Sequence, residues 1–369
     1  DSLQVSPSGA NGVDTGGLCR CFISIPGRFR AGIMNILLLM VSKGKGTGGM
    51  EKHCQELANG LSARRHCVTC ATSIYHQSQL SEGVKRVTLN TDKSRFSPSL
   101  LIAVMKIIKE GHFDVVHAQG SKAAAILQLL APLLRRVTVI ATIHSFKSTY
   151  PKTRAFCKII AVSKKLAADI GYANVIVVYN GIASTPASEL SESLPANLEH
   201  PVWLAVGRLV PAKAFDFLIN AFQHVKGTLL IAGSGPEQKN LEQQIRATSQ
   251  QNKVVLLGHR DDVPALMAFA NGVVISSRRE GFSYVFAEAL LAGKPVIATN
   301  VPIANEFLDS RFIHSEFNSE IFANMLMTNT DELKRDQSDV RKKAERSLSL
   351  NNMIENTISV YSECLNRSD

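Results

Sequence analysis

The sequence is poor in the features that mark several common protein classes. Aromatic residues make up 6% of its 369 positions, and there is a single tryptophan. It has no zinc-finger spacing and no interleaving of basic and aromatic residues, which disfavours a dedicated nucleic-acid-binding protein. No stretch reaches about 18 uninterrupted apolar residues, so a membrane-spanning helix is not expected.

Cysteine is also scarce, and its seven occurrences are scattered along the chain. An odd, dispersed set in a protein of this size suggests a reducing compartment, as for a cytoplasmic protein. Cys67 and Cys70 form a C-x-x-C within an expected strand, where residues three apart point to opposite faces. Because no second cysteine pair stands at zinc-like spacing, we expect no metal site there.

What is present describes an ordinary soluble globular protein. Hydrophobic residues make up 45% and charged residues 20%, and the chain is long enough for two domains. Residues 1–33 differ from the rest, because they are rich in glycine and serine and precede Met34, which opens the apolar run MNILLLM. We expect residues 1–33 to be a disordered leader or an artefact of cloning or annotation.

The net charge of +10 is unevenly distributed. Up to Ile182 there are 23 Lys and Arg residues against 9 Asp and Glu, whereas the remainder has 18 against 22. A basic first half suggests an anionic partner. An anionic membrane surface or a phosphorylated lipid fits this pattern at least as well as nucleic acid, and solubility alone is a further explanation.

Apolar runs alternate with helix-period stretches in two successive series, over residues 34–182 and 200–345. Near-continuous apolar strands separated by helices predict parallel sheets covered on both faces. We therefore expect an α/β protein with two doubly wound, Rossmann-like domains. Residues 183–199, rich in Ser and Pro, are the predicted linker, and residues 346–369 a C-terminal helix that packs back toward the first domain.

Four polar segments follow expected strands, at the edge where this fold binds ligands and where the domains should face each other across a cleft. They are KGKGTGGMEKH (43–53), GRLVPAK (207–213), LIAGSGPEQ (230–238) and RREGF (278–282). The first lacks the P-loop spacing and the G-x-G-x-x-G order, which disfavours those phosphate sites. In the third, the turn alone explains Gly233 and Gly235.

Two cations, Arg208 and Lys213, stand in GRLVPAK. An arginine can bind a diphosphate bidentately and a lysine can add a point charge, although two solvated charges explain the motif equally well when it is taken alone.

Two glutamates, Glu280 and Glu288, stand eight residues apart. The first is in a loop, and the second is about a turn inside a helix that Ser283 is predicted to cap before Tyr284. Catalytic carboxylates of a retaining glycosidase flank one bond at about 5 Å. Helical rise places these two about 10 Å apart, which favours two clamps on one elongated ligand over a hydrolytic dyad. The amides at the start of the helix offer an anion site.

Together these segments resemble a known family. GRLVPAK, GSGPE and REGFSYVFAEALLAGKPVIAT are similar to the second domain of the family 4 retaining glycosyltransferases of the GT-B fold. The resemblance extends from about Met34 to the C-terminal helix, and it is to bacterial lipopolysaccharide-core and envelope-glycan enzymes. It implies a nucleoside-diphosphate sugar donor, with UDP as the expected nucleotide, and a glycan or glycolipid acceptor. It also implies a location in the cytoplasm, at the inner face of the inner membrane.

The resemblance further implies roles for individual residues. Arg208 and Lys213 would hold the donor diphosphate and act in catalysis. Glu288 would bind the ribose hydroxyls, and Glu280, a third catalytic group, would contact the transferred sugar. The other implied donor contacts are Gly48, Gly49, the backbone from Gly258 to Arg260, and the amides of Gly281, Phe282 and Ser283.

His117, in DVVHAQG, matches a family histidine near the reacting sugar and is the fourth implied catalytic residue. Many members have a second histidine where this chain has Gln119, so the contact could fall instead on Gln119 or on His144. The family usually follows the lysine of the G-R-L motif with glycine. Here that residue is Ala214, which would narrow or stiffen the turn.

No D-x-D-like metal site falls at a strand end, and the two cations make one unnecessary, so neither a metal nor another cofactor is expected. The resemblance implies retention of configuration, with domain closure excluding water. A basic first domain would suit an anionic glycolipid through Lys106, Lys109, Arg135, Arg136, Lys164 and Lys165. A transferase for soluble sugars or glucans, and a non-catalytic nucleotide-binding protein of the same fold, remain alternatives.

Overall fold

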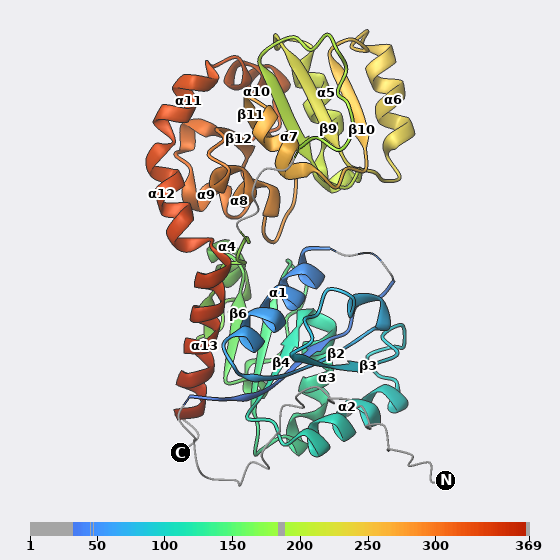
Figure 1. The fold of residues 1–369 in the computed structure, drawn as a ribbon, viewed down its shortest axis with the longest axis vertical. Helices are drawn as coiled ribbons and strands as arrows, with labels where there is room; N and C mark the ends of the chain where they lie inside the picture. The colour runs from blue at the N-terminus through green and yellow to red at the C-terminus, as the bar shows by residue number, and fades with distance from the viewer. Residues whose placement is uncertain (1–31, 45, 47, 184–188, 367–369) are drawn as a thin grey trace, which may run out of the picture. The chain divides into compact units, whose positions relative to one another are not determined.

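A computed structural model describes residues 32–44, 46, 48–183 and 189–366. The chain divides into two units, Asp1–Ile33 and Met34–Asp369. The expected leader, except for its last two residues, lies outside the described part. The second unit contains two sheets with their helices, coloured blue to green and yellow-green to orange in Figure 1.

The strands of the first sheet run in the order β3-β2-β1-β4-β5-β6-β7, and every neighbouring pair is parallel. In chain order they are β1 (Asn35–Met40), β2 (Cys67–Thr72), β3 (Val84–Thr88), β4 (Val115–Gln119), β5 (Thr138–Ile143), β6 (Lys158–Ala161) and β7 (Val175–Val177). Ile36 to Met40 of β1 are fully buried, as expected for a central strand covered on both faces.

The helices of the first domain are α1 (Gly49–Ala63), α2 (Pro98–Gly111), α3 (Gly120–Leu130) and α4 (Lys164–Ile170). α1 buries Cys54, Leu57 and Leu61, which the helical period predicts. α3 ends at Leu130, earlier than the apolar pattern suggests, and a 3₁₀ turn (Ala131–Leu133) with proline in its first turn follows. Proline lacks the N–H that an α-helix interior requires.

The strands of the second sheet run in the order β10-β9-β8-β11-β12-β13, again all parallel. They are β8 (Val202–Val206), β9 (Thr228–Ala232), β10 (Val254–Gly258), β11 (Gly272–Ile275), β12 (Val296–Thr299) and β13 (Ile313–His314). The helices are α5 (Phe215–Phe222), α6 (Gln238–Ala247), α7 (Val263–Phe269), α8 (Tyr284–Leu291), α9 (Ala304–Phe307), α10 (Ser319–Leu326), α11 (Thr330–Asp336) and α12 (Ser338–Ser347). The prediction of two doubly wound parallel sheets is confirmed.

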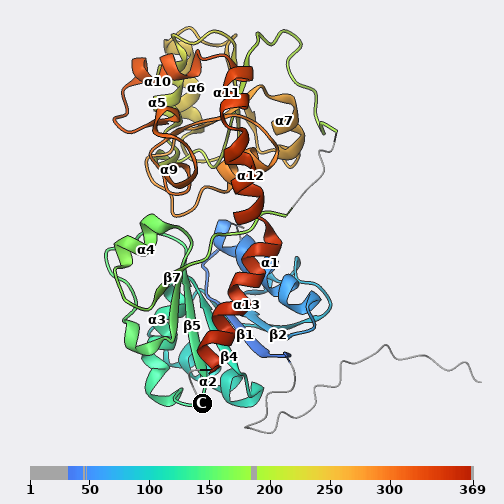
Figure 2. The same ribbon diagram turned by 90° about the vertical axis from the view of Figure 1, so that its left-hand side faces the viewer.

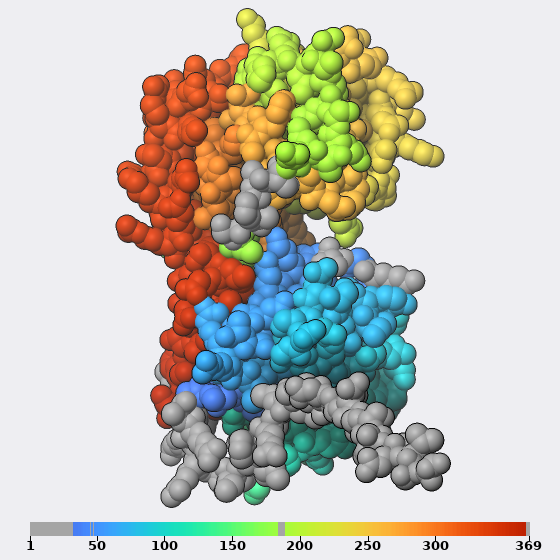
Figure 3. Space-filling model, in the orientation of Figure 1, coloured from blue at the N-terminus to red at the C-terminus, as the bar shows by residue number. Residues whose placement is uncertain are grey.

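The last helix, α13 (Leu350–Asn366), belongs structurally to the first sheet. Ile182 and Ser349 form a parallel bridge just before it, and its buried face includes Met353, Val360 and Tyr361. Figure 2 shows α13 alongside the strands of the first sheet, and in the space-filling view of Figure 3 it lies against the residues of α1.

A disulfide joins Cys157, just before β6, to Cys364 in α13. The odd number of cysteines suggests a compartment in which thiols stay reduced, and this disulfide differs from that expectation. Local sequence could not reveal it, because the two residues are 207 positions apart. Among the described residues, every helix is too short or too polar to cross a membrane.

Candidate functional site

The order of the second sheet changes direction between β8 and β11, and the loops after these two strands carry the predicted cations and Glu280. In open α/β sheets ligands bind at such a point, outside the carboxyl ends of the strands. Arg208 lies two residues after the end of β8 and is exposed. Its guanidinium makes no hydrogen bond or ion pair within the described part of the chain.

Glycines join the turns after β8 and β9 closely. The Gly207 N–H donates to the Ala232 carbonyl at 3.0 Å, and a Cβ on Gly233 would stand 1.9 Å from the Gly207 carbonyl oxygen. A Cβ on Gly235 would stand 2.4 Å from the Leu209 carbonyl oxygen. Backbone packing thus requires both glycines, as the sequence pattern predicts, and it holds Arg208 at the strand end.

Lys213 and Glu280 are brought together at this edge. The Lys213 ammonium donates to Oε1 of Glu280 at 2.9 Å, and the Ser277 hydroxyl donates to the same oxygen at 2.5 Å. The Glu280 side chain is 7% exposed and that of Lys213 is 23% exposed. The cation and the carboxylate are therefore each other's principal partners in this structure.

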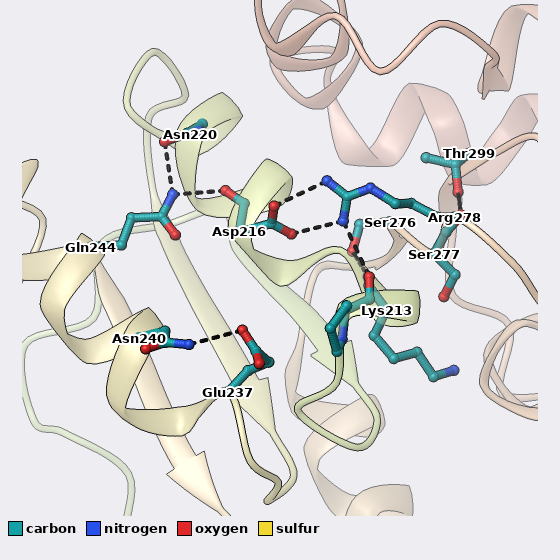
Figure 4. Close-up of polar contacts among 11 residues, drawn as sticks. Lys213, Asp216, Asn220, Glu237, Asn240, Gln244, Ser276, Ser277, Arg278 and Thr299 are labelled. Atoms are coloured by element: carbon teal, nitrogen blue, oxygen red, sulfur yellow. Dashed lines mark hydrogen bonds and ion pairs between the residues drawn. The ribbon is translucent and has the colours of Figure 1, made fainter.

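Arg278 holds the turn that carries Lys213. Its guanidinium forms a forked pair with Asp216 at 2.9 and 3.0 Å, and its backbone N–H donates to the Ala212 carbonyl at 2.8 Å. The fork lowers the pKa of Asp216. Figure 4 shows the fork, together with the bond from Ser276 to the Lys213 carbonyl at 2.8 Å.

The loop after β11 contacts the first domain at Gly281, whose backbone lies against the backbone of His144. A Cβ on Gly281 would stand 2.0 Å from the His144 carbonyl oxygen, so only glycine permits this approach. Phe282 is buried against Tyr284, with ring centroids 5.2 Å apart. Ser283 precedes α8 as predicted, but its hydroxyl makes no capping bond and is buried without a partner among the described residues.

Glu288 is paired with a residue of α1. Oε1 of Glu288 accepts from the Lys52 ammonium at 2.9 Å. The Tyr284 hydroxyl donates to the Gly49 carbonyl at 3.0 Å, and a Cβ on Gly49 would collide with the Tyr284 ring at 2.8 Å. Gly48, one residue earlier, donates its N–H to Glu51 at 2.9 Å. The predicted glycine loop thus approaches α8 closely.

A half-buried carboxyl, Glu56, lies beside this pair. Burial raises its pKa to about 7, with Lys52 acting in the opposite direction and Glu288 adding to the rise. Its Oε2 atom is buried and has no hydrogen-bond partner among the described residues. Nothing in the sequence marks Glu56, because an acidic residue in the second turn of a helix is usually solvated.

The ring of His117 is bonded at both nitrogens within the protein. Its ring is fully buried, with Nδ1 2.6 Å from the Tyr361 hydroxyl and Nε2 2.7 Å from the Thr142 hydroxyl. Burial lowers its pKa to about 3, so the ring is neutral. Tyr361 comes from α13, which covers this part of the strand, and a contact of His117 with the sugar stays a prediction. Of the two alternatives, His144 is less buried, and its Nε2 lies 3.0 Å from Oε1 of Gln119.

The side chain of Arg260 forms ion pairs within the protein. Its guanidinium donates to both carboxylate oxygens of Asp262, at 2.8 and 2.6 Å, and to Glu192 at 3.1 Å. The side chain therefore joins the linker to the second domain. A contact from the backbone between Gly258 and Arg260 to a donor base stays a prediction. Within the described ranges, no three His, Cys, Asp or Glu side chains are gathered in a way that could hold a metal ion.

Sequence reasoning missed the partners of the predicted residues. Lys52 and Tyr284 stand inside quoted motifs but received no role, because their contacts join residues more than 230 positions apart. Arg278 stands two residues before Glu280 in RREGF, and no local feature of the sequence indicates its ion pair with Asp216, 62 positions away.

Comparison with known proteins identifies the chain. The model described as "Glycosyltransferase Family 4" matches residues 47–185, and the one described as "Glycosyl transferases group 1" matches residues 187–344. An uncharacterized glycosyltransferase of Methanocaldococcus jannaschii is 26% identical over 302 residues, or 69% of this chain and 77% of that protein. The lipopolysaccharide core biosynthesis glycosyltransferase LpsD of Rhizobium meliloti is 26% identical over 270 residues, or 68% and 75% of the two chains.

Among solved structures, HepE of Anabaena in complex with UDP and glucose superposes with a TM-score of 0.73 at 22% identity. The superposition covers 89% of this chain and 100% of that one. Such a match concerns the fold, which is that of the GT-B proteins. The two family models adjoin and together span most of the chain, so this protein belongs to glycosyltransferase family 4 and has the GT-B fold.

Proposed function

We propose that this glycosyltransferase moves a hexose-type sugar from a nucleoside diphosphate, UDP in the first instance, to a glycan or glycolipid acceptor of a bacterial envelope. The observation that carries the proposal is the cluster at the switch point of the second sheet. There Arg208 is exposed and lacks a partner among the described residues, and Lys213 and Glu280 are paired at 2.9 Å. A sugar diphosphate presents an anion for the cations and hydroxyls for the carboxylate.

The difficult step is cleavage of the bond between the anomeric carbon and the diphosphate. Negative charge grows on the leaving phosphate oxygen, where Arg208, Lys213 and the amides of Gly281 to Ser283 would stabilise it. Preorganised donors of this kind commonly contribute several kcal/mol, and loss of one costs about 100-fold or more in rate. With this charge supplied by side chains and amides, the proposed reaction requires no metal.

In the proposed reaction the acceptor hydroxyl attacks on the face from which the diphosphate leaves, so that the anomeric configuration is retained. Glu280 would hold hydroxyls of the transferred sugar while Glu288 exchanges Lys52 for the ribose hydroxyls. The separate partners of the two glutamates support this division, because they share none among the described residues.

A surface on α2 and around the end of α3 supports an amphiphilic, anionic acceptor. Ile102 is 69% exposed and Leu133 is 68% exposed. The neighbouring exposed cations are Lys106, Lys109, Arg135 and Arg136. Apolar side chains flanked by cations bind anionic lipid surfaces. We propose that this surface contacts the cytoplasmic leaflet that holds the acceptor.

The first test is a thermal-shift titration with UDP, GDP, ADP and CMP. A ligand that binds only the native state raises its stability in proportion to RT ln(1 + [L]/Kd). A shift with one of these nucleotides identifies the base of the donor. Sugar nucleotides with that base can then be tested as donors for transfer. NMR of the product gives the anomeric configuration, and activity in the presence of EDTA shows whether a metal is required. No shift with any of them would oppose the proposal and favour the non-catalytic alternative.

The acceptor surface needs its own test. Sedimentation with anionic vesicles should fall strongly for Ile102→Ser combined with Leu133→Ser. The matched control is Ile321→Ser, on α10, where the side chain is 47% exposed. Equal vesicle binding by the two variants, or salt-independent activity on soluble acceptors with no vesicle binding, would favour a soluble acceptor.

A further inference from the structure

The proposed reaction leaves one carboxyl near the predicted ribose contact, Glu56, without a role. Glu56 stands four residues after Lys52 in α1, and residues at this spacing share one face of a helix. Its side chain is half-buried, and its Oε2 atom is buried without a hydrogen-bond partner among the described residues. Because buried polar atoms are normally hydrogen-bonded, a partner is expected for this oxygen in some state of the protein.

Lys52 is the cation that can serve two carboxyls here. Its ammonium donates to Oε1 of Glu288 at 2.9 Å and lies 5.1 Å from the centroid of the Tyr284 ring. The Lys52 side chain is 40% exposed, which leaves it room to change rotamer. Burial acts to lower the pKa of Lys52, but Glu288 and, more weakly, Glu56 raise it above its ordinary value. Lys52 is therefore coupled electrostatically to both carboxyls.

Glu56 competes poorly for Lys52 in this structure. Burial raises the pKa of Glu56 to about 7, with Lys52 acting in the opposite direction and Glu288 adding to the rise. Burial, followed by Glu56, raises the pKa of Tyr284 well above its usual value, so the phenol stays neutral. The other elements against α1 include β1, β2, β3 and α13, and no described residue of these contributes to the shift at Glu56. The charge on Glu56 thus depends on where the Lys52 ammonium lies.

A bound nucleotide would change this competition. If Glu288 accepts hydrogen bonds from the ribose hydroxyls, it has less capacity for the ammonium, and a partly buried ammonium without a carboxylate is costly. We propose that Glu56 is a positioning residue for the nucleotide, because it takes over the Lys52 ammonium when the ribose hydroxyls take Glu288. The inference rests on the proposed function and adds a residue to its donor site.

This transfer of Lys52 couples nucleotide binding to the release of a proton. While Lys52 pairs with Glu288, burial keeps part of the Glu56 carboxyl protonated near pH 7. Once Lys52 pairs with Glu56, the adjacent cation lowers the pKa of that carboxyl. A pKa that falls on binding makes affinity rise with pH. The rise should level off above about pH 7, where Glu56 is already ionised in the free protein.

The test measures UDP affinity by calorimetry at pH 6 and pH 8 for the wild-type protein and Glu56→Gln, with the base replaced if the titration above identifies another. Glutamine keeps the shape of the side chain but cannot ionise, so Lys52 continues to compete for Glu288. The terminal phosphate of UDP also titrates near pH 6, and its contribution cancels when the two proteins are compared at the same pH. The ratio of wild-type to Glu56→Gln affinity should rise about fivefold or more from pH 6 to pH 8.

Further variants separate this role from a merely structural one. Glu355→Gln neutralises a carboxylate that pairs with Arg64 at the other end of α1, and its affinity should equal that of the wild type at both pH values. Lys52→Met removes the cation that moves, so adding Glu56→Gln to it should change UDP affinity by less than about twofold at pH 8. If Glu56→Gln does not fold, the ratio of wild-type to Lys52→Met affinity provides the same test, because it should rise with pH in the same way.

A ratio of wild-type to Glu56→Gln affinity that is the same at pH 6 and pH 8 would overturn the inference while leaving the proposed function intact. An undiminished effect of Glu56→Gln in the Lys52→Met protein would do the same, because Glu56 would then act without Lys52. Binding of no nucleotide by the wild-type protein would instead overturn the proposed function, and this inference with it.

Discussion

The ammonium of Lys213 lies 2.9 Å from Oε1 of Glu280, across two loops that follow adjacent strands. Each charge compensates the other while the site holds no donor. A diphosphate would draw on Lys213 and a sugar on Glu280, so the pair separates into two contacts on one ligand. Because Glu280 is nearly buried, removing only its partner would leave a carboxylate without compensation, which is costly.

Substitution of Glu288 should mainly affect nucleotide binding, whereas substitution of Glu280 should mainly affect the rate of transfer. Glu288→Ala would remove the proposed charge-assisted hydrogen bonds to ribose, and it should weaken UDP binding about tenfold or more. Glu280→Ala should lower the transfer rate about 100-fold with less effect on free UDP, which has no sugar. Calorimetry with UDP and steady-state rates measure the two effects.

An exposed glutamate provides the control for these variants. Glu345→Ala removes a partner of Arg341 in α12 and should change neither quantity. Equal losses of UDP affinity in the Glu280 and Glu288 variants would contradict the division of roles.

Ala214 should be a point of backbone strain. Its φ is 52°, in the left-handed region, and it is fully buried. That conformation costs an L-residue about 1–2 kcal/mol, which glycine avoids, while glycine adds about 0.5–1 kcal/mol of unfolded-state entropy. Ala214→Gly should therefore raise the free energy of unfolding by up to about 1 kcal/mol in urea titrations.

The neighbouring alanine tests this explanation. Ala212 is exposed and does not have a positive φ. Ala212→Gly should destabilise the protein by about 0.5–1 kcal/mol. If both substitutions destabilise it to the same extent, left-handed strain at Ala214 is not the explanation.

Apolar periodicity is sufficient to predict the strands of both sheets other than β13, because residues buried on both faces need no long-range information. It also placed Glu280 in a loop at a strand end and Glu288 inside a helix. The short elements β13 and α9 carry too few residues for a period to be recognised. The domain boundaries and the donor contacts of individual residues stay predictions.

Pairings between distant residues could not be predicted. The motif DVVHAQG suggests that His117 lies near a strand end, whereas it is the middle residue of β4, and only Tyr361, 244 residues later, shows that the ring is covered. Lys52 and Glu288 are 236 residues apart. Such contacts join elements that are distant in sequence, α13 in the first case and α8 in the second, and neither helical nor strand periodicity contains that information.

The Cys157–Cys364 disulfide should stabilise the attachment of α13. It closes a loop with a sequence separation of 207, and removal of a native disulfide commonly costs about 2–5 kcal/mol. A strong reductant should lower the midpoint of urea unfolding of the wild-type protein. The double variant Cys157→Ser with Cys364→Ser should unfold at this lower midpoint without reductant, and reductant should not change its midpoint. A wild-type midpoint that reductant leaves unchanged would argue against a stabilising bond.

Stability should fall as the pH is lowered from 7 to 5. Burial lowers the pKa of His53 to about 4 and that of His117 to about 3, so between about pH 4.5 and 6.5 the unfolded chain binds protons that the folded chain does not. Glu56 acts in the opposite direction, because burial raises its pKa to about 7 and the folded chain holds that proton. Two histidines outweigh one carboxyl, and the free energy of unfolding should rise with pH in this window.

Two substitutions should change this slope in opposite directions. His53→Asn removes a group that binds a proton only when unfolded, and should flatten the slope by up to about 1.4 kcal/mol per pH unit. Glu56→Gln removes the opposing group and should steepen it, since the histidines then act unopposed. Urea unfolding at pH 5, 6 and 7 measures both slopes. An unchanged slope in Glu56→Gln would mean that its carboxyl is ionised in the folded protein, paired with Lys52 in place of being held neutral by burial.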